Sequence, residues 1–400
     1  MELKEIKKED FNDLASKFQC KNFFQTSNMG DSLEYRGKKV YYLGLIENDA
    51  IKAVTMLVEN GTFMGKKIFQ ALKGFLIDYN NASLVKEFSE KLQEFVSDNN
   101  GFMLMIDPYI LKMERDIDGN VVSGGKNNLE VVFLLEKLGY IKCKHDTQVR
   151  FNFCLDVIGK SEEEVFSNFK ATTRNLINKA LREGVEIIDL KYEELAKFKA
   201  ITEDTCKRRG FSDKSLEYYQ SMYKSFGDQV VFKLARLNVG KYQSYLENLK
   251  KDYENKINKI AGNNKKKDNY LFEVGNIEKK LSKIKDLPIE EGYVNLAAAM
   301  FMLYGSETIY LFSGSYDELN EFGGQYLIQW QVIQYAINHG YKRHNFFGIL
   351  NFDNPKDKEY GIYLFKRGFG GYVEELLGEY VLYTKGLVSK IHRLKDKVRK

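Results

Sequence analysis

Residues 40–79 read VYYLGLIENDAIKAVTMLVENGTFMGKKIFQALKGFLIDY, in which strand-like runs rich in Val, Ile, Tyr and Phe alternate with short turns. The turns carry Asn-Asp, Asn-Gly and Met-Gly, and the stretch therefore predicts an antiparallel meander. Residues 83–101 follow with helical spacing and a terminal glycine, which predicts a helix. The short apolar run FMLMIDP at 102–108 predicts a buried strand after it.

The same order of elements occurs again in the second half of the chain. Strand-like runs at 228–242 and 292–316 precede a helix-period segment at 326–342 and a short apolar run at 344–349. A meander, a helix and a strand, present twice, predict an α+β fold with two acetyltransferase-like (GNAT-like) domains in tandem.

An insertion separates the first two strands of the second unit. We expect a first domain over 1–150, a second over 151–241 and 288–400, and an inserted antiparallel helical hairpin, or coiled-coil arm, over 242–287. An insertion between adjacent strands has to bring its ends back together, which favours a hairpin that projects from the body. A helix pair folded onto the body as ordinary core is the alternative. The hairpin is indicated by two runs of apolar residues at helical spacing: Leu246, Leu249, Tyr253, Ile257 and Ile260, then Leu271, Val274, Ile277, Leu281 and Ile284.

Composition excludes several classes of protein. A chain of 400 residues with 44% hydrophobic and 29% charged residues is neither disordered nor low-complexity, and three prolines argue against a Pro-rich linker. The charged N-terminus has no apolar segment of a secretory signal, so a cytoplasmic protein is expected. No apolar run approaches the roughly twenty residues that cross a bilayer. The four cysteines are scattered, so we expect neither a metal site nor a disulfide framework.

Signatures of the common catalytic classes are absent, including G-x-S-x-G, the P-loop and H-E-x-x-H. Chemistry would then depend on carboxylates, lysines, tyrosines and backbone amides. Phe365, Lys366 and Arg367 precede the run GFGG, so two cations lie at the edge of an open loop that suits an anionic ligand or a developing oxyanion. A sheet end would need the same alternation of aromatic residues and glycine.

Two further places carry candidate residues with a structural alternative. Asp107 ends a strand before a proline, where it could face a ligand or form a turn. Lys214 and Tyr218 follow the basic run KRRG and would share a helical face, which fits either a phosphate site or a solvated charged turn.

Taken together, the chain resembles the Fem family of non-ribosomal peptidyltransferases (FemABX type), which transfer amino acids from aminoacyl-tRNA to the peptide stem of peptidoglycan precursors. The resemblance rests on an ordered set of segments: FFQTS (23–27), GFLIDY (74–79), MIDP (105–108), SEEEVFSNFKATTRNLINKALREGVEI (161–187), TCKRRGF (205–211), YLFSGSYDE (310–318), QYLIQWQVIQYAINHGYKRHNFFGI (325–349) and LFKRGFGG (364–371).

The resemblance implies residue roles. Lys366 matches the lysine that stabilises the tetrahedral intermediate, and Asp107 matches an aspartate of the precursor site beside the acceptor amine. The other matches imply substrate binding by Phe365, Arg367, Lys214, Tyr218 and Tyr310. The family's N-terminal phosphate-binding lysine has no match here, and Arg36 and Lys38 are substitutes.

The resemblance also implies partners. It predicts transfer of Gly, Ala or Ser to the stem peptide without a cofactor or a metal, by a monomer or weak dimer. The hairpin is similar to the arm of longer members that act on the lipid-linked precursor, which favours lipid II over UDP-MurNAc-pentapeptide. A tRNA-dependent transferase acting on protein N-termini, and an RNA-binding module without chemistry, are the alternatives.

The charge distribution agrees with these partners. Residues 241–290 hold 12 lysines against 8 acidic residues, and residues 384–400 hold 7 basic residues against one aspartate. Two basic surfaces suit a tRNA backbone, met by Lys265, Lys266 and Lys267, and an anionic membrane-linked substrate, so peripheral contact with the inner membrane leaflet is also implied. Solvation alone is the alternative explanation for these three lysines.

Overall fold

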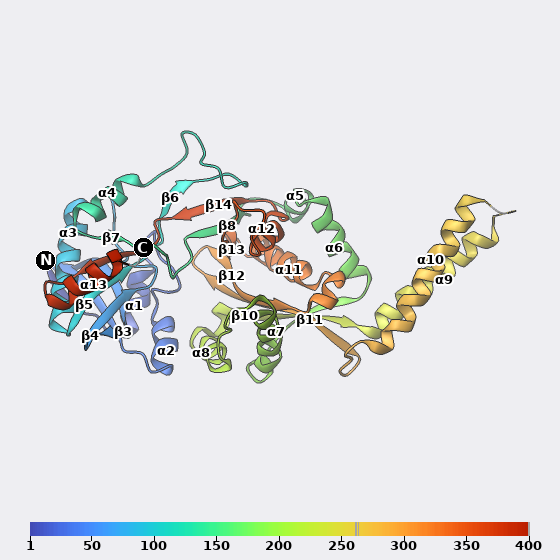
Figure 1. Cartoon of the computed structure of the whole chain (residues 1–400), viewed down its shortest axis with the longest axis horizontal. Coiled ribbons are helices and arrows are strands. Elements are labelled where there is room, and N and C mark those ends of the chain that lie inside the picture. Colours follow the sequence, from blue (N-terminus) through green and yellow to red (C-terminus); the bar gives the residue numbers. More distant parts are fainter. Residues whose placement is uncertain (261, 263, 399–400) are drawn as a thin grey trace.

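The computed structural model describes residues 1–260, 262 and 264–398, and in this part of the chain the strands form two mixed sheets (Figure 1). The predicted duplication is confirmed, because each half contains a meander, a helix and a strand parallel to the last meander strand. In the first half the elements are β2 (Val40–Glu47), β3 (Ala50–Phe63), β4 (Lys66–Ala71), α3 (Ala82–Asp98) and β5 (Gly101–Ile106). In the second half they are β10 (Val230–Asn238), β11 (Tyr293–Tyr304), β12 (Glu307–Ser315), α11 (Gly324–Asn338) and β13 (Arg343–Gly348).

The two halves exchange strands. The first sheet has the order β1-β2-β3-β4-β5-β15-β7, and the second has the order β6-β14-β8-β13-β12-β11-β10-β9. Besides the strands of the two meander units, the sheets contain β1 (Glu2–Glu5), β6 (Leu111–Glu114), β7 (Ile141–Lys142), β8 (Phe151–Asp156), β9 (Val185–Asp189), β14 (Tyr372–Leu376) and β15 (Tyr380–Tyr383). The expected division at residue 150 misses this exchange, because β6 joins the second sheet and β15 joins the first.

Helices cover both sheets. On the first sheet, α3 and α4 (Leu129–Lys137) pack on one face and α13 (Leu387–Val398) on the other. On the second sheet, α7 (Leu195–Arg209) and α8 (Leu216–Phe226) pack on one face. Its other face holds α11 with α5 (Glu162–Ser167), α6 (Ala171–Arg182) and α12 (Tyr360–Arg367). Short 3₁₀ turns lie at Tyr192–Glu194, Gly227–Gln229, Ile284–Asp286 and Asp317–Phe322.

A direct interface joins the halves. The helices α1 (Lys8–Ala15) and α2 (Ser27–Tyr35) share one hydrophobic cluster with α7 and α8. Ser32 and Ser221 hydroxyls lie 2.8 Å apart across it, and the Asn28 amide donates to the Ser225 carbonyl at 2.7 Å. The packing places α2 of the first half beside α8 of the second.

The insertion forms two helices that pack on each other and project from the body (Figure 1). They are α9 (Val239–Asn258) and α10 (Lys265–Lys283), and Lys250 pairs with Glu278 between them at 2.7 Å. Leu246 and Ile277 anchor the base of the pair in the core of the second domain. The helix pair therefore projects as expected and does not fold onto the body, and its coiled-coil packing stays a prediction.

Within the described residues, no helix has both the length and the apolar composition that crossing a membrane requires.

Candidate active site

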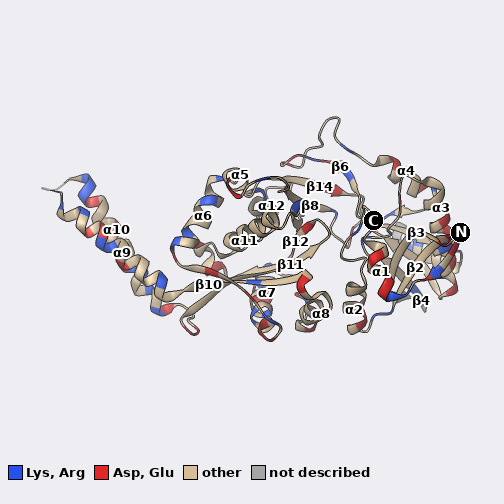
Figure 2. Ribbon diagram, turned by 180° about the vertical axis from the view of Figure 1, so that it is seen from behind, with Lys and Arg blue, Asp and Glu red and all other residues tan. Residues whose placement is uncertain are grey.

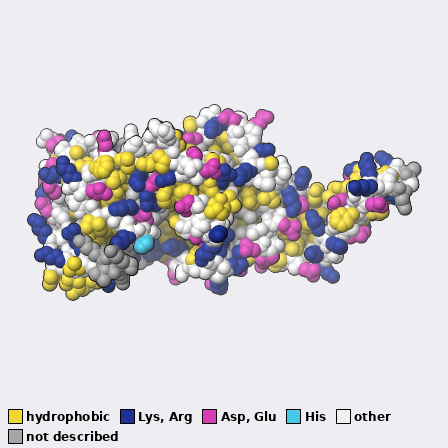
Figure 3. Space-filling view, turned by 45° about the horizontal axis from the view of Figure 1, so that its top comes forward, with side chains coloured by type: hydrophobic (Ala, Val, Ile, Leu, Met, Phe, Trp, Pro, Cys, Tyr) yellow, Lys and Arg dark blue, Asp and Glu magenta, His cyan; other side chains and the backbone are white. Residues whose placement is uncertain are grey.

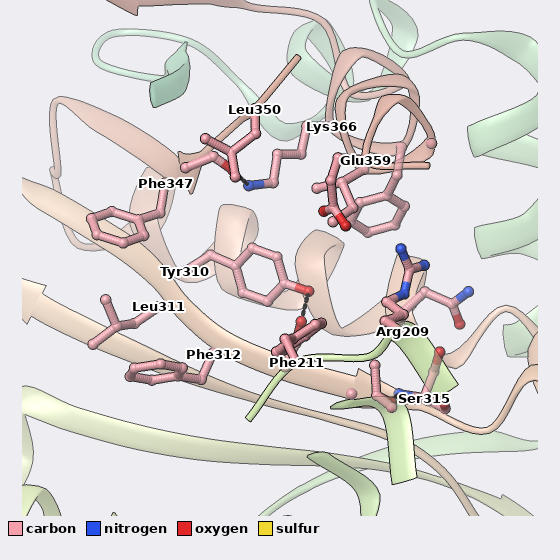
Figure 4. Close-up of a pocket in the computed structure, with 18 of the residues that line it drawn as sticks. Arg209, Phe211, Tyr310, Leu311, Phe312, Ser315, Phe347, Leu350, Glu359 and Lys366 are labelled. Atoms are coloured by element: carbon pink, nitrogen blue, oxygen red, sulfur yellow. Dashed lines mark hydrogen bonds between the residues drawn. The ribbon is translucent and has the colours of Figure 1, made fainter. Parts of the chain in front are cut away.

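A cavity opens where the parallel strands β12 and β13 separate. The two strands pair over only three residues each, Glu307–Ile309 with Arg343–Asn345. Beyond these pairs the chain lines a cavity of about 650 Å³ with residues of both strands and the loops after them (Figure 4). The carboxyl ends of parallel strands are a common place for ligands, because the loops diverge there. This geometry makes the cavity the first candidate for the functional site.

Lys366 reaches this cavity from the last turn of α12. The sequence placed it at the edge of a loop, whereas in the structure the helix continues through Arg367. Its ammonium donates to the Gly348 carbonyl at 2.5 Å, and its side chain is 5% exposed. Burial lowers the pKa of Lys366 to about 7, because the charged form loses hydration. Lys366 therefore exchanges its proton near neutral pH in the absence of a bound anion.

The glycines after α12 serve packing. Gly371 has a φ of +108°, and a Cβ there would lie 2.1 Å from the Cys154 carbonyl oxygen. A Cβ at Gly368 would lie 2.5 Å from the Thr173 hydroxyl. Close approach of the chain to β8 and α6 thus accounts for these two glycines, which favours the sheet-end interpretation of the run over an anion-binding loop.

Tyr310 forms the wall opposite Lys366. Its ring stacks on Phe301 of β11 with centroids 5.3 Å apart, and the Lys366 ammonium lies 5.8 Å from the Tyr310 ring centroid. The Tyr310 hydroxyl donates to the Ser313 hydroxyl at 2.5 Å. Tyr310 is held on β12, and Lys366 is held on α12 by its hydrogen bond to Gly348 of β13, so their spacing is fixed before any ligand arrives.

A buried histidine lies in the core next to this site. His344 accepts from the Thr308 hydroxyl at 2.8 Å through Nδ1, and its Nε2 donates to the Gln329 amide oxygen at 3.0 Å. These partners assign the neutral tautomer with the proton on Nε2. Burial and then the Lys366 charge lower the pKa of His344 to about 3. His344 is therefore neutral at physiological pH and supports the site through hydrogen bonds.

The cavity also contains charged residues that were not predicted as site residues, among them Arg209 and Glu359. Arg209 ends α7, and Figure 4 shows its guanidinium and the Glu359 carboxylate around the same space as the Tyr310 hydroxyl. The positive charge of Arg209 acts to lower the pKa of Tyr310, while burial raises it more. The basic run before Gly210 was visible in the sequence, but nothing there indicates which of its cations faces a cavity.

A second group of predicted residues lies at the interface between the halves. The Arg36 guanidinium lies 4.6 Å from the Tyr218 ring centroid, and the Lys214 ammonium lies 5.7 Å from it. Arg36 also donates to the Ser32 carbonyl at 2.8 Å, which fixes its position at the end of α2. Burial raises the pKa of Tyr218 to about 12. We call Arg36, Lys214 and Tyr218 the cation–tyrosine cluster.

The cation–tyrosine cluster adjoins the cavity. The ring of Phe312, which lines the cavity, meets the Tyr218 ring edge-on with centroids 5.6 Å apart. Phe365 lines the same cavity and packs against Tyr326 and Phe369. The structure thus brings together Lys366, Phe365 and Tyr310 in one cavity, with the cluster beside it.

Asp107 does not line this cavity, and its place in the precursor site stays a prediction. Its carboxylate is 1% exposed and pairs with the Lys73 ammonium at 2.8 Å, and it also accepts from the Lys73 backbone N–H at 2.6 Å. Lys73 in turn donates to the carbonyl of Val149, which is a residue of the cavity wall. Asp107 therefore supports the wall from behind, because a buried carboxylate requires the cation that neutralises it.

The structure places the other predicted site residues away from the cavity. Arg367 points to the first half and pairs with Asp118 at 2.5 Å, so its guanidinium is already engaged. Lys38 is exposed in the turn after α2 and does not line the cavity. Lys265 and Lys266 are exposed and Lys267 is half-buried at the start of α10, at the outer end of the arm.

Comparison with known proteins identifies the family. The model of the FemAB family matches residues 6–397. The chain is 27% identical over the full length of both proteins to aminoacyltransferase FemA of Staphylococcus epidermidis, and 26% identical over 95% of both to aminoacyltransferase FemB of the same species. The crystal structure of FemX has a TM-score of 0.74, with 18% identity, 99% of this chain covered and 100% of that chain. A tandem GNAT protein from the clavulanic acid pathway has a TM-score of 0.54, with 8% identity, covering 96% of this chain and 99% of that chain.

Proposed function

Because this chain belongs to the FemAB family, we propose that it is an aminoacyltransferase that moves glycine, alanine or serine from aminoacyl-tRNA to the stem-peptide amine of a peptidoglycan precursor. The observation that carries the proposal is Lys366, a buried cation facing a cavity of about 650 Å³. Building the interpeptide bridge on lipid II is the more specific form of this proposal. These substrates place the reaction in the cytoplasm.

The chemistry needs little beyond positioning and charge stabilisation. The acceptor amine attacks the ester carbonyl, a C–N bond forms, the C–O bond to the tRNA ribose breaks, and the amine proton passes to the ribose oxygen. An aminoacyl ester is already activated, so oriented proximity lowers much of the barrier. The negative charge that develops on the carbonyl oxygen is stabilised by a fixed ammonium in a site that excludes water.

Lys366 has the geometry for that role. One of its three N–H donors is bound to the Gly348 carbonyl, which leaves two for a ligand oxygen. A pKa of about 7 in the free protein rises when an oxyanion binds, because an opposite charge nearby favours the protonated form. Lys366 is then charged in the transition state, where the charge is needed.

The cation–tyrosine cluster is the proposed site for the phosphates of the precursor. Arg36 and Lys214 place two cations around one ring, and guanidinium groups bind phosphate through paired hydrogen bonds. The cluster touches the cavity through Phe312, so a precursor held by its phosphates can extend its peptide toward Lys366. Tyr310 and Phe365 would then form the walls around the stem peptide, and Arg209 would meet an anionic group of either substrate.

The arm is the proposed contact for tRNA. Figure 2 shows Lys and Arg positions, coloured blue on the ribbon, along both of its helices and towards its outer end. Lys265, Lys266 and Lys267 lie at the N-terminus of α10, where the helix dipole disfavours positive charge. A phosphate backbone would neutralise both the dipole and the lysines, and such contacts weaken as salt increases.

The test is a transfer assay read by mass. The protein is incubated with a panel of tRNAs charged with single amino acids, together with lipid-linked or nucleotide-linked pentapeptide. We expect one or more added residues of glycine, alanine or serine on the precursor. A protein substrate with a free N-terminus is included in parallel. Mass added to that protein alone, or to no acceptor, would overturn the proposal.

A further inference from the structure

We propose that the outward face of α13, together with the β3–β4 turn, is a docking surface for an anionic lipid bilayer. Two leucines on this helix are largely exposed to solvent: Leu387 is 73% exposed and Leu394 is 62% exposed. They lie seven residues apart, so they share one face of the helix two turns apart. We call this face, with Met64 of the turn, the α13 surface.

The inner face of α13 already has its packing, which separates it from the α13 surface. Val388 packs against the hydrophobic cluster on the first sheet, and the Ser389 hydroxyl donates to the Phe102 carbonyl at 3.1 Å. The His392 Nδ1 and the Tyr383 hydroxyl lie 3.0 Å apart. These contacts hold the helix flat on the sheet, so Leu387 and Leu394 are presented to the outside by a fixed scaffold.

The β3–β4 turn extends the same surface. Phe63 contacts the helix through the His392 ring at 4.9 Å between centroids and the Lys395 ammonium at 5.2 Å from its centroid. The next residue, Met64, is 62% exposed at the tip of the turn. An exposed methionine and two exposed leucines on adjacent elements make an apolar surface that single scattered residues would not make.

Charge identifies the occupant as an anionic bilayer. Lys390, Arg393 and Lys395 are exposed on α13, and no ion pair with a described side chain of residues 1–395 engages them. The last seventeen residues carry 7 basic residues against Asp396. A helix with exposed leucines flanked by cations lies in the headgroup region of anionic lipid, with the leucines inserted and the cations beside phosphates. Hydrophobic and basic side chains are adjacent at this end of the molecule (Figure 3).

The purpose of this surface rests on the proposed lipid-linked acceptor, but its test does not. A docked enzyme would meet its acceptor by diffusion in the plane of the membrane. Vesicle binding is measured without tRNA or precursor, so a failure of docking and a failure of transfer are separate results.

The experiment is co-sedimentation of the full chain with vesicles of phosphatidylcholine containing about one third phosphatidylglycerol, compared with vesicles of phosphatidylcholine alone. We expect binding to the anionic vesicles that weakens with added salt. The variant Leu387→Ser/Leu394→Ser should bind about tenfold or more weakly, because it removes the inserted side chains. The variant Lys390→Gln/Arg393→Gln should lose most of the salt dependence.

The matched control is Leu181→Ser/Leu271→Ser, which removes two leucines exposed elsewhere, at 56% and 51%. It should bind within about twofold of the wild type. Equal binding by the two double-serine variants, or absence of binding by the wild type, would overturn the proposal. Sedimentation velocity provides the remaining test: a wild-type dimer that Leu387→Ser/Leu394→Ser converts to monomer would assign the surface to a second copy of the chain instead.

Discussion

The two halves of the molecule end their parallel strand pairs in opposite ways. In the first half, β4 and β5 stay paired to Ala71 and Ile106, and the space beyond them is closed by the buried pair of Lys73 and Asp107. In the second half, β12 and β13 part early and leave a cavity that contains Lys366. The same position of a duplicated fold therefore holds a neutralised cation in one copy and an open one in the other.

This difference shows where binding energy is available. An ammonium that is buried without a carboxylate is costly, and its lowered pKa reflects that cost. A negative ligand recovers the cost at Lys366, whereas Lys73 has already recovered it through Asp107 at 2.8 Å. We therefore propose that the functional site lies in the second half, where the charge of Lys366 is left for a substrate.

The largest expected effect comes from removing the ammonium of Lys366. Lys366→Met should reduce transfer by about 10³-fold, because the oxyanion loses its fixed positive charge. The assay is single-turnover transfer to the precursor, with circular dichroism to verify the fold. Arg367→Met is the matched control on the same helical turn, since that guanidinium pairs with Asp118 outside the cavity, and it should stay within about threefold of the wild type. Near-normal turnover by a well-folded Lys366→Met protein would contradict the account.

In the first half, breaking the ion pair of Lys73 with Asp107 should lower the stability of the protein. Lys73→Met leaves Asp107 buried without its cation and should lower the free energy of unfolding by about 3–5 kcal/mol. Adding Asp107→Leu to this variant should restore most of that loss, because both charges are then gone. Urea unfolding followed by circular dichroism measures both effects. A Lys73→Met variant as stable as the wild type would show that the ion pair does not stabilise this end of the first sheet.

The lowered pKa of Lys366 should make the free energy of unfolding depend on pH. Lys366 has a pKa of about 7 in the folded protein against an ordinary value of about 10.5, so between these values the unfolded chain binds more protons at this residue. Wild-type stability from this group therefore rises as pH increases from 7 to 10.

Lys366→Met removes that rise. The variant should be more stable than the wild type by a few kcal/mol at pH 7, and the difference should shrink toward zero by pH 10. The measurement is the free energy of unfolding of both proteins at several pH values. A difference that stays constant over this range would contradict the buried, cavity-facing environment of the lysine.

The smallest expected effect concerns precursor affinity. Arg36→Ala should raise the KM for the precursor about tenfold with little change in kcat, because it removes one phosphate contact from the cation–tyrosine cluster. Lys38→Ala, two residues away and exposed, should change KM by less than about twofold. Steady-state kinetics with the nucleotide-linked or lipid-linked precursor decide between them, and equal effects would remove Arg36 from the proposed site.

The sequence predicts those features that depend on local pattern. Turn chemistry and periodicity were sufficient for the duplicated meander, helix and strand and for the projecting helix pair, and the family motifs indicated Lys366 and Tyr310. The ion pair of Lys73 with Asp107 was not predictable, because the partners follow two different strands, β4 and β5, and only the folded register of these strands brings them together. The strand exchange of β6 and β15 also depends on tertiary pairing between short segments. Arg209 shares its basic run with two other cations, and only the end of α7 determines which of them faces the cavity.

Photo-crosslinking can locate the bound stem peptide on the protein. A precursor with a photoreactive group on the acceptor end of its stem peptide is bound to the protein, irradiated and mapped by peptide mass spectrometry. We expect crosslinks within residues 310–315, 347–350 and 359–366, around the open end of β12 and β13. Crosslinks confined to residues 72–78 or 107–110, at the closed end of β4 and β5, would contradict this expectation.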